Sequence, residues 1–301
     1  MSGEHGEAGR GKLYVVATPI GNLGDITLRA IDTLRAVDTV FAEDTRHAQR
    51  LLSHHGVTTK LAALHEHNER TAARAALRLL AAGRDVALVT DAGTPGISDP
   101  GALAVAEARA AGFAVVPIPG PSAGVAALSV AGLPGPFAFV GFLPPKPAAR
   151  ARAVAAWRDF PHTLVFYEAP HRVLECVDDL AAVLGGERTV VLARELTKVF
   201  ESVHVGRLGT AREWLGADPN RVRGEFVVLV SGAAPAADAR AQEGERVLGR
   251  LLEALPVKTA VRLAAEITGA SRNALYDRAL TLKGKQPRKA PKSRRTGPGQ
   301  R

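Results

Sequence analysis

The segment VTDAGTPGISDPG, residues 89–101, has the composition of a loop that touches a ligand. It begins within an apolar run that predicts a buried strand, and it contains three glycines and two aspartates but no lysine or arginine. Glycine lets a backbone approach a ligand closely and adopt dihedral angles that other residues avoid. A phosphate cradle would instead carry a basic residue and few carboxylates. The loop therefore predicts a ligand that is not an anion.

The two standard nucleotide signatures are absent from this sequence. Gly21 and Gly24 do not form G-x-G-x-x-G, and no G-x-x-x-x-G-K-[ST] occurs, which disfavours an enzyme that uses NAD or ATP. A ligand with hydroxyl groups and a positive charge but no phosphate fits better. S-adenosylmethionine is such a ligand, because its ribose diol can donate to a carboxylate and its sulfonium favours nearby oxygens.

Three further polar loops are expected beside this one. Short apolar strands at 13–17, 39–42, 86–89 and 114–118 alternate with helical runs, which is typical of a parallel α/β sheet. They lead into ATPIGNLGDIT, AEDTR, TDAGTPGISDPG and PIPGPSA. Ligands of open α/β sheets bind outside the carboxyl ends of the strands. The sequence therefore predicts a ligand site where these loops gather.

The composition changes near residue 134 and predicts further domains. PGPFAFVGFLPPKP is dense in proline and glycine, and strands are expected at 163–167, 189–193, 203–205 and 226–230. Beyond the linker-like AAPAADARAQ, short helices broken by TGAS form a helix-turn-helix-like pattern. The predicted organisation is a disordered extension at 1–11, an N-terminal α/β domain at 12–133, a second α/β domain at 134–232, a helical module at 243–282 and a basic disordered tail at 283–301.

The net positive charge of the chain is concentrated in that tail. Lysine and arginine together number 39 against 30 acidic residues, and the tail holds eight of the basic residues, which leaves 31 for the rest. A terminal basic run with Pro, Gly, Ser and Gln is typical of a disordered, solvated segment. It is also suited to bind nucleic acid electrostatically, and both interpretations stay open.

No segment predicts secretion or a membrane span. The N-terminus lacks an apolar signal region, and although residues 110–145 carry no charge, seven prolines interrupt them. Their longest helix-compatible piece, 122–132, is shorter than the about 20 residues that a span needs. The single cysteine, Cys176, excludes an internal disulfide and a cysteine-based zinc cluster. We expect a soluble, cytoplasmic protein.

An ordered set of motifs resembles one known family. LYVVATPIGNLGDIT, FAEDTRHAQRLL, HEHNE, TDAGTPGISDPG, PIPGPSA, FLPPK, FYEAPHR, ARELTKVFE and RGEFVVLVSG occur in this order, and the resemblance extends over residues 13–282. Together they resemble the RsmI family, 16S rRNA (cytidine-2′-O)-methyltransferases. VAGLP departs from the family pattern, which has Ser-Gly-Leu-Pro there, and FLPPKPAAR is sparser in basic residues than is usual.

The resemblance implies both a fold and a substrate. The fold is the tetrapyrrole-methylase-like fold of class III methyltransferases, with two α/β domains, a cleft for S-adenosylmethionine between them and a small C-terminal helical module that contacts RNA. The implied assembly is a homodimer. The implied substrate is the ribose of one cytidine in the decoding region of 16S rRNA, in the small ribosomal subunit.

The cofactor is expected to contact loops and strand ends of both domains. Ser122 can equally be the N-cap of its helix, and Phe226 can equally be a core residue. Asp99 precedes Pro100 and is interpreted as a turn residue, whereas Asp91 at a strand end is the better ligand contact. The predicted cofactor contacts are Pro19, Gly21, Asp91, Ala92, Gly93, Thr94, Ser122, Ala123, Tyr167, Glu225 and Phe226.

Methyl transfer to a ribose 2′-hydroxyl needs a group that accepts or orients the hydroxyl proton. Our hypothesis is that Asp44 of AEDTR is that group, while Arg46 and Arg172 hold the neighbouring phosphates. The alternative is that Asp44 and Arg46 form an ion pair that braces the next helix. The predicted catalytic residues are Asp44, Arg46, Glu43, Glu168, Arg172 and Glu195.

Basic residues after the hinge-like segment and on the last helix are expected to contact RNA. They are Lys146, Arg150, Arg152 and Arg272. His65 and His67 have no partnering ligand motif, so no metal site is predicted. Two other functions stay open: a small-molecule methyltransferase of the tetrapyrrole type, and an RNA-binding factor without catalysis.

Overall fold

The computed structural model describes residues 10–233 and 239–282. Most of the predicted N-terminal extension and all of the predicted tail lie outside these residues. The extension was predicted to reach residue 11, and this is wrong for its last two residues. The Gly11 N–H donates to the Leu80 carbonyl at 2.9 Å, and the Arg10 guanidinium lies 5.0 Å from the centre of the Phe113 ring.

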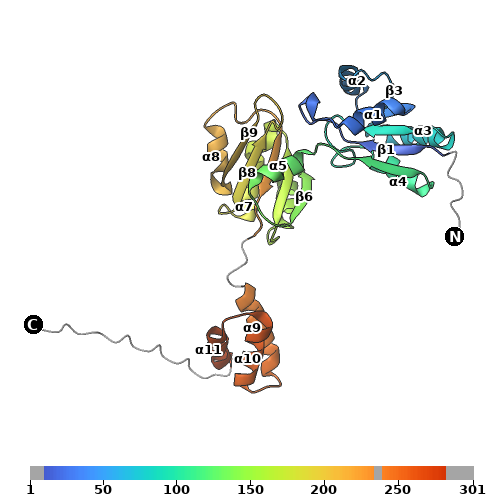
Figure 1. The fold of residues 1–301 in the computed structure, drawn as a ribbon. Coiled ribbons are helices and arrows are strands. Elements are labelled where there is room, and N and C mark those ends of the chain that lie inside the picture. The colour runs from blue at the N-terminus through green and yellow to red at the C-terminus, as the bar shows by residue number, and fades with distance from the viewer. Residues whose placement is uncertain (1–9, 234–238, 283–301) are drawn as a thin grey trace, which may run out of the picture. The chain divides into compact units, whose positions relative to one another are not determined.

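The first sheet is entirely parallel, as the strand and helix alternation predicted (Figure 1). Its order is β3-β2-β4-β1-β5. Helices cover both faces, because α1 and α2 pack on one core and α3 and α4 on another. The strands are β1 (Lys12–Val16), β2 (Thr39–Ala42), β3 (Lys60–Ala63), β4 (Val86–Val89) and β5 (Ala114–Ile118). The helices are η1 (Leu23–Asp25), α1 (Leu28–Ala36), α2 (Thr45–His54), α3 (Glu69–Ala81) and α4 (Ala102–Ala110).

The second sheet is mixed, with the order β6-β7-β10-β8-β9. Only β6 and β7 pair in parallel; the other pairs are antiparallel. One face packs on α6, α7 and α8 around a large core. The strands are β6 (Phe137–Phe142), β7 (Thr163–Glu168), β8 (Thr189–Arg194), β9 (Ser202–Arg207) and β10 (Phe226–Val230). The helices are α6 (Pro147–Ala155), η2 (Pro170–Arg172), α7 (Val173–Leu184), η3 (Leu208–Thr210) and α8 (Ala211–Gly216).

The opposite face of the second sheet carries the helix α5 (Ala123–Ala131), which was assigned to the first domain. Ala127 and Ala131 of this helix share a core with Val165 and Val191 of the second sheet. The predicted boundary at residue 133 is therefore wrong. The helix continues the alternating pattern of the first domain in sequence, but its apolar side is buried by the second.

The C-terminal helices form a separate compact unit that begins at Ala233. They are α9 (Ala239–Leu252), α10 (Val257–Thr268) and α11 (Arg272–Leu282). Leu248, Val261 and Leu275 form the centre of their own core. Helix α9 begins four residues before the predicted module. Across the described ranges, the structure contains no helix with the length and hydropathy of a membrane span.

Candidate functional site

The loops at the carboxyl edge of the first sheet are tied to one another by hydrogen bonds. Thr18 and Gly93 exchange two backbone bonds of 2.9 and 3.1 Å, and the Thr18 hydroxyl donates to the Thr90 carbonyl at 3.0 Å. The Thr94 hydroxyl donates to the Pro121 carbonyl at 3.2 Å. Gly93 has a φ of 82°, which glycine adopts without strain. The loops after β1, β4 and β5 therefore form one connected surface.

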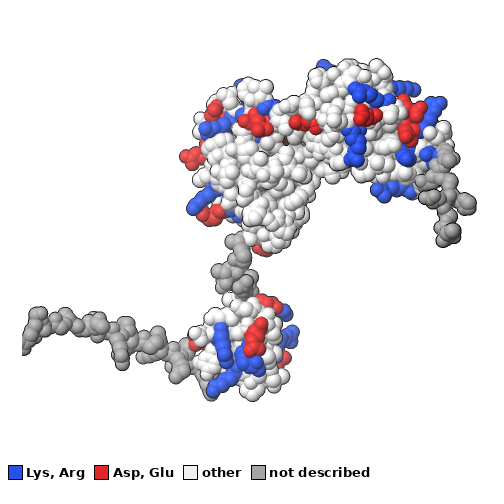
Figure 2. Space-filling model, viewed as in Figure 1, with Lys and Arg blue, Asp and Glu red and all other residues white. Residues whose placement is uncertain are grey.

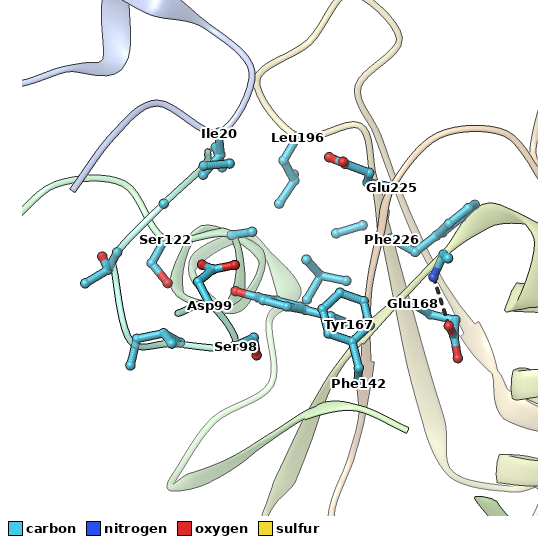
Figure 3. Close-up of a pocket in the computed structure, with 18 of the residues that line it drawn as sticks. Ile20, Ser98, Asp99, Ser122, Phe142, Tyr167, Glu168, Leu196, Glu225 and Phe226 are labelled. Carbon is cyan, nitrogen blue, oxygen red and sulfur yellow. Dashed lines mark hydrogen bonds between the residues drawn. The ribbon is translucent and has the colours of Figure 1, made fainter. Parts of the chain in front are cut away.

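This surface is one wall of a pocket of about 350 Å³, and the other wall comes from the second sheet (Figure 3). The first wall includes Gly93, Thr94 and Asp99, and the second includes Tyr167 and Phe226. The remaining lining residues are Ile20, Ala92, Ile97, Ser98, Ser122, Ala123, Phe142, Glu168, Ala169, Pro170, Ala193, Leu196, Glu225 and Val227.

The lining is acidic and contains no lysine, arginine or histidine. Asp99, Glu168 and Glu225 supply carboxylates. Burial, together with the neighbouring charges of Glu43 and Asp91, raises the pKa of Asp99 to about 6. The lining thus suits a ligand with cationic or hydroxyl groups, and none of its side chains offers a positive charge to a phosphate.

Tyr167 joins the second wall to the start of α5. Its hydroxyl accepts a hydrogen bond from the Gly124 N–H at 3.0 Å. Its ring meets Phe139 and Phe142 edge to face, with centroids 5.0 and 5.6 Å apart. Burial raises the pKa of the Tyr167 hydroxyl, so this group stays protonated at neutral pH. The aromatic edge and the hydroxyl are fixed in place before any ligand binds.

Comparison with known proteins gives the family. The model of tetrapyrrole (corrin/porphyrin) methylases matches residues 12–212, and that of the RsmI C-terminal HTH domain matches residues 238–283. Ribosomal RNA small subunit methyltransferase I of Xylella fastidiosa is 54% identical over 267 residues, which are 88% of this chain and 98% of that protein. The Pseudomonas aeruginosa protein of the same name is 53% identical, over 91% of this chain and 99% of its own length.

The chain belongs to the ribosomal RNA small subunit methyltransferase I family. This confirms the predicted family. Solved structures of lower identity show the same fold. The methyltransferase CobJ has a TM-score of 0.57 at 22% identity, covering 74% of this chain and 95% of its own. Uroporphyrin-III-C-methyltransferase from Thermus thermophilus has a TM-score of 0.53 at 23% identity, covering 74% and 96%. The predicted tetrapyrrole-methylase-like fold is confirmed.

Most residues that the sequence assigned to the cofactor line the pocket of this family member. They are Ala92, Gly93, Thr94, Ser122, Ala123, Tyr167, Glu225 and Phe226. Ser122 precedes α5 but makes no side-chain cap bond, so its hydroxyl is not used by the helix. Phe226 is only 3% exposed, yet it lines the pocket, so its two predicted roles are compatible.

Three of the assigned residues are not part of the lining. Pro19 and Gly21 lie beside the lining residue Ile20, and Gly21 approaches Lys198 of the second domain. The Asp91 carboxylate turns away and accepts the backbone N–H of Asp44 at 3.1 Å. Asp99, which was interpreted as a turn residue, lines the pocket instead. The only sequence signal for the role of Asp99 was that it is a second aspartate in the same loop, eight residues after Asp91.

In the AEDTR segment, the Asp44 carboxylate caps the start of helix α2 and is not free. The Asp44 carboxylate caps α2 by accepting the Arg46 N–H at 2.8 Å, and it pairs with the Arg46 guanidinium at 2.8 Å. These bonds to Arg46 hold the pKa of Asp44 far below its usual range. A carboxylate held this way is a poor proton acceptor. The geometry agrees with the alternative interpretation, in which Asp44 and Arg46 brace the helix.

The other predicted catalytic carboxylates have partners as well. Glu168 accepts the Ala169 N–H at 2.9 Å, and its Oε1 lies 3.2 Å from Arg172 Nε. Arg172 also donates to the Leu143 carbonyl at 2.6 Å, so it is held inside the wall. Glu195 pairs with Lys198 at 2.8 Å. Burial raises the pKa of Glu43, which faces Asp91 outside the lining.

Of the four residues predicted to contact RNA, three are exposed and one is buried. Lys146, Arg152 and Arg272 are exposed. Arg150 is only 1% exposed and donates to Asp179 Oδ2 at 2.6 Å and to Glu175 Oε2 at 3.3 Å. It therefore cannot contact RNA, and the prediction for Arg150 is wrong. Its position on α6 turns it toward α7, whereas Arg152 two residues later points outward.

His65 and His67 lie with their ring centres 6.1 Å apart. Neither belongs to a group of three or more metal-binding side chains, and the described residues contain no such group. His65 Nδ1 is buried and has no hydrogen-bond partner among the described atoms. The pair lies in the segment that leads into α3.

Proposed function

We propose that this protein transfers a methyl group from S-adenosylmethionine to the 2′-hydroxyl of a cytidine in the decoding region of 16S rRNA. The observation that carries the proposal is the acidic, cation-free pocket between the two sheets, in a chain that is 54% identical to a ribosomal RNA small subunit methyltransferase I. Both the chemistry of the pocket and the names of the relatives support it.

The residues of the pocket fit this cofactor. Carboxylates and carbonyl oxygens favour a sulfonium and can accept from the ribose diol. Ile20, Leu196 and Val227 offer apolar contacts for the adenine ring, and Tyr167 and Phe142 offer aromatic ones. When bound, the cofactor supplies a methyl group that its positive charge already activates. The work left to the protein is to orient the hydroxyl, exclude water and take the proton.

Asp99 is the residue that we propose for the proton. Its carboxylate lines the pocket, it has no ion-pair partner among the described residues, and its pKa is about 6. A base whose pKa lies near the working pH is the most effective kind, and such a base contributes about 10²–10⁴-fold. Asp44 is less suited, because Arg46 holds its carboxylate ionised.

Methylation of defined RNA tests the function. Small ribosomal subunits from a bacterial strain without this methylation would be incubated with the protein and labelled S-adenosylmethionine. We expect label in 2′-O-methylcytidine after digestion to nucleosides, and a new primer-extension stop at low dNTP. In a parallel incubation that contains a tetrapyrrole instead of subunits, label in the tetrapyrrole combined with no label in RNA would favour the small-molecule alternative. RNA binding without cofactor binding would favour the non-catalytic one.

Exposed cations around the pocket are the candidates for phosphate contacts. Next to the pocket lies a hollow of about 470 Å³ that shares Pro170 with it and is also lined by His171 and Arg223. Both side chains are exposed. With Lys146 and Arg152 they replace Arg150 and Arg172 as the proposed contacts of this unit, and Arg272 is the proposed contact of the separate C-terminal unit. Replacing them singly should lower RNA affinity and the salt dependence of binding.

A second copy of the chain is the proposed partner for the α5 face. One nine-residue helix cannot cover five strands, so Phe137, Phe139, Val203 and Val205 remain 38–54% exposed, beside Val130 of α5 at 55%. Figure 2 shows almost no charge on the surface over α5 and β6. An apolar surface of this kind is typical of a subunit interface. Sedimentation should give a dimer for the native chain and a monomer for Val130→Asp.

A further inference from the structure

The loop between β8 and β9, residues 195–201, exposes two large apolar side chains at its tip. Val199 is 93% exposed and Phe200 is 70% exposed. The base of the loop belongs to the pocket, because Leu196 lines it. Four residues of chain span at most about 14 Å, so Phe200 lies within about 14 Å of the lining residue Leu196.

The backbone of this loop is strained. Glu195 has a φ of 52° and Thr197 a φ of 68°, in a region that non-glycine residues avoid. Such conformations persist only where the surrounding structure enforces them, and they concentrate at functional sites. The strained residues flank Leu196, which packs partly buried against the core beside α5, whereas Val199 and Phe200 stay exposed.

A network of polar contacts enforces this conformation. Lys198 Nζ lies 2.8 Å from both Glu195 Oε1 and Glu225 Oε2. The Glu225 N–H donates to Glu195 Oε1 at 2.9 Å, and the Glu195 N–H donates to the Glu225 carbonyl at 3.0 Å. Arg194 Nη2 donates to the Phe200 carbonyl at 2.9 Å. The tip is therefore held firmly, although its side chains face solvent.

The loop also meets the first domain across the pocket. A Cβ added at Gly21 would lie 2.5 Å from Lys198 Cγ and 2.9 Å from Thr197 Oγ1. Only glycine fits at this position. The close approach fixes the tip relative to the first wall as well as the second.

We infer that Phe200 is a stacking platform for a nucleobase of the RNA, next to the nucleotide whose ribose enters the pocket. The inference rests on the proposed function. Single-stranded RNA is recognised by stacking its bases on aromatic side chains that are held rigid and close to cations. The Arg194 guanidinium donates to the carbonyls of Phe200 and Arg223, Lys198 lies two residues before Phe200, and Arg223 is exposed. Phe200 acts here as a positioning residue.

The test compares four variants of the full chain on small ribosomal subunits. Phe200→Ala should raise the KM for the subunits about tenfold, with kcat and the Kd for S-adenosylmethionine unchanged. Phe200→Trp should restore the KM. Phe200→Leu keeps the apolar area but has no ring face, so it should remain impaired. Val199→Ala is the matched control on the same loop and should change the KM less than threefold.

If Phe200 contacts another part of the chain or a second copy, and not RNA, the test gives different results. If Phe200→Ala dissociates a dimer or lowers the melting temperature by several degrees, the tip is an internal or subunit contact and the inference is wrong. A KM that Leu restores as well as Trp also overturns it. If the native chain does not methylate RNA at all, the proposed function fails. If it does and Phe200→Ala behaves as native, only the stacking inference fails.

Discussion

The wall of the pocket from the first sheet is built mainly from backbone, whereas the wall from the second sheet is built mainly from side chains. In the first, Thr18 and Gly93 exchange backbone hydrogen bonds, and the hydroxyls of Thr18 and Thr94 donate to backbone carbonyls of neighbouring loops. In the second, Tyr167, Glu168 and Phe226 project from paired strands. Parallel strands end at one edge of the sheet and bring their loops together, whereas the end of β7 pairs with the start of β10 and presents the side chains of the strands themselves. The first wall should therefore be sensitive to glycine changes and the second to side-chain truncation.

The largest expected effect is a loss of stability when Arg150, which is buried between α6 and α7 of the second domain, is replaced. Arg150→Ala removes the partner of Asp179, whose side chain is 27% exposed, and leaves a cavity between α6 and α7. Loss of a buried pair of this kind costs about 3 kcal/mol. Urea unfolding should show this loss, while Arg152→Ala on the same helix should stay within about 0.5 kcal/mol. Equal unfolding midpoints for the two variants would contradict the assignment of Arg150 to the core.

The proposed role of Asp99 predicts a pH dependence. The carboxylate can accept a proton only when it is ionised, so single-turnover methylation should fall as the pH drops below about 6. Asp99→Asn should lower the rate about 100-fold at pH 7.5 and make it independent of pH between 5 and 7.5. Cofactor affinity measured by calorimetry serves as the control. A rate profile that keeps its acid limb in Asp99→Asn would remove this residue from the proposal.

The importance of backbone conformation in the wall from the first sheet can be tested at two glycines of one loop. Gly93 and Gly96 have φ values of 82° and 80°, so alanine is strained at both. Only Gly93 bonds to Thr18 and lines the pocket. A strain of about 1–2 kcal/mol should raise the cofactor Kd about tenfold in Gly93→Ala. Gly96→Ala should destabilise the chain similarly but leave the Kd within threefold; equal Kd values would show that the strain acts on the whole loop.

The smallest effect is expected at Asp44. Asparagine is as good an N-cap as aspartate, so Asp44→Asn should methylate within about threefold of the native rate. Asp44→Ala loses the cap and should lower the Tm by about 2 °C. Differential scanning calorimetry and single-turnover assays measure the two quantities. A rate loss of tenfold or more in Asp44→Asn would restore Asp44 as the proton acceptor and weaken the case for Asp99.

Several elements were predictable because their signals are local. Strands β2, β4, β5 and β10 have the predicted bounds. The edge strand β3 was not predicted, because Lys60–Ala63 is short and only partly buried. Helix α5 was predicted in the right place but with the wrong partner, since its pattern shows that one side is apolar and does not show which sheet will bury it.

The sequence by itself determined the family, the alternation of strands and helices, and the acidic character of the loop that lines the pocket, because that loop carries two aspartates and no basic residue. Tertiary structure decided which of two aspartates in that loop faces the pocket, since Asp91 is drawn to the backbone of Asp44 and Asp99 is not. It also decided which of two nearby arginines is exposed. Arg150 and Arg152 have the same chemistry, but only the position of α7 determines which of them finds Asp179. Such outcomes depend on contacts between segments far apart in the chain, and no local pattern records them.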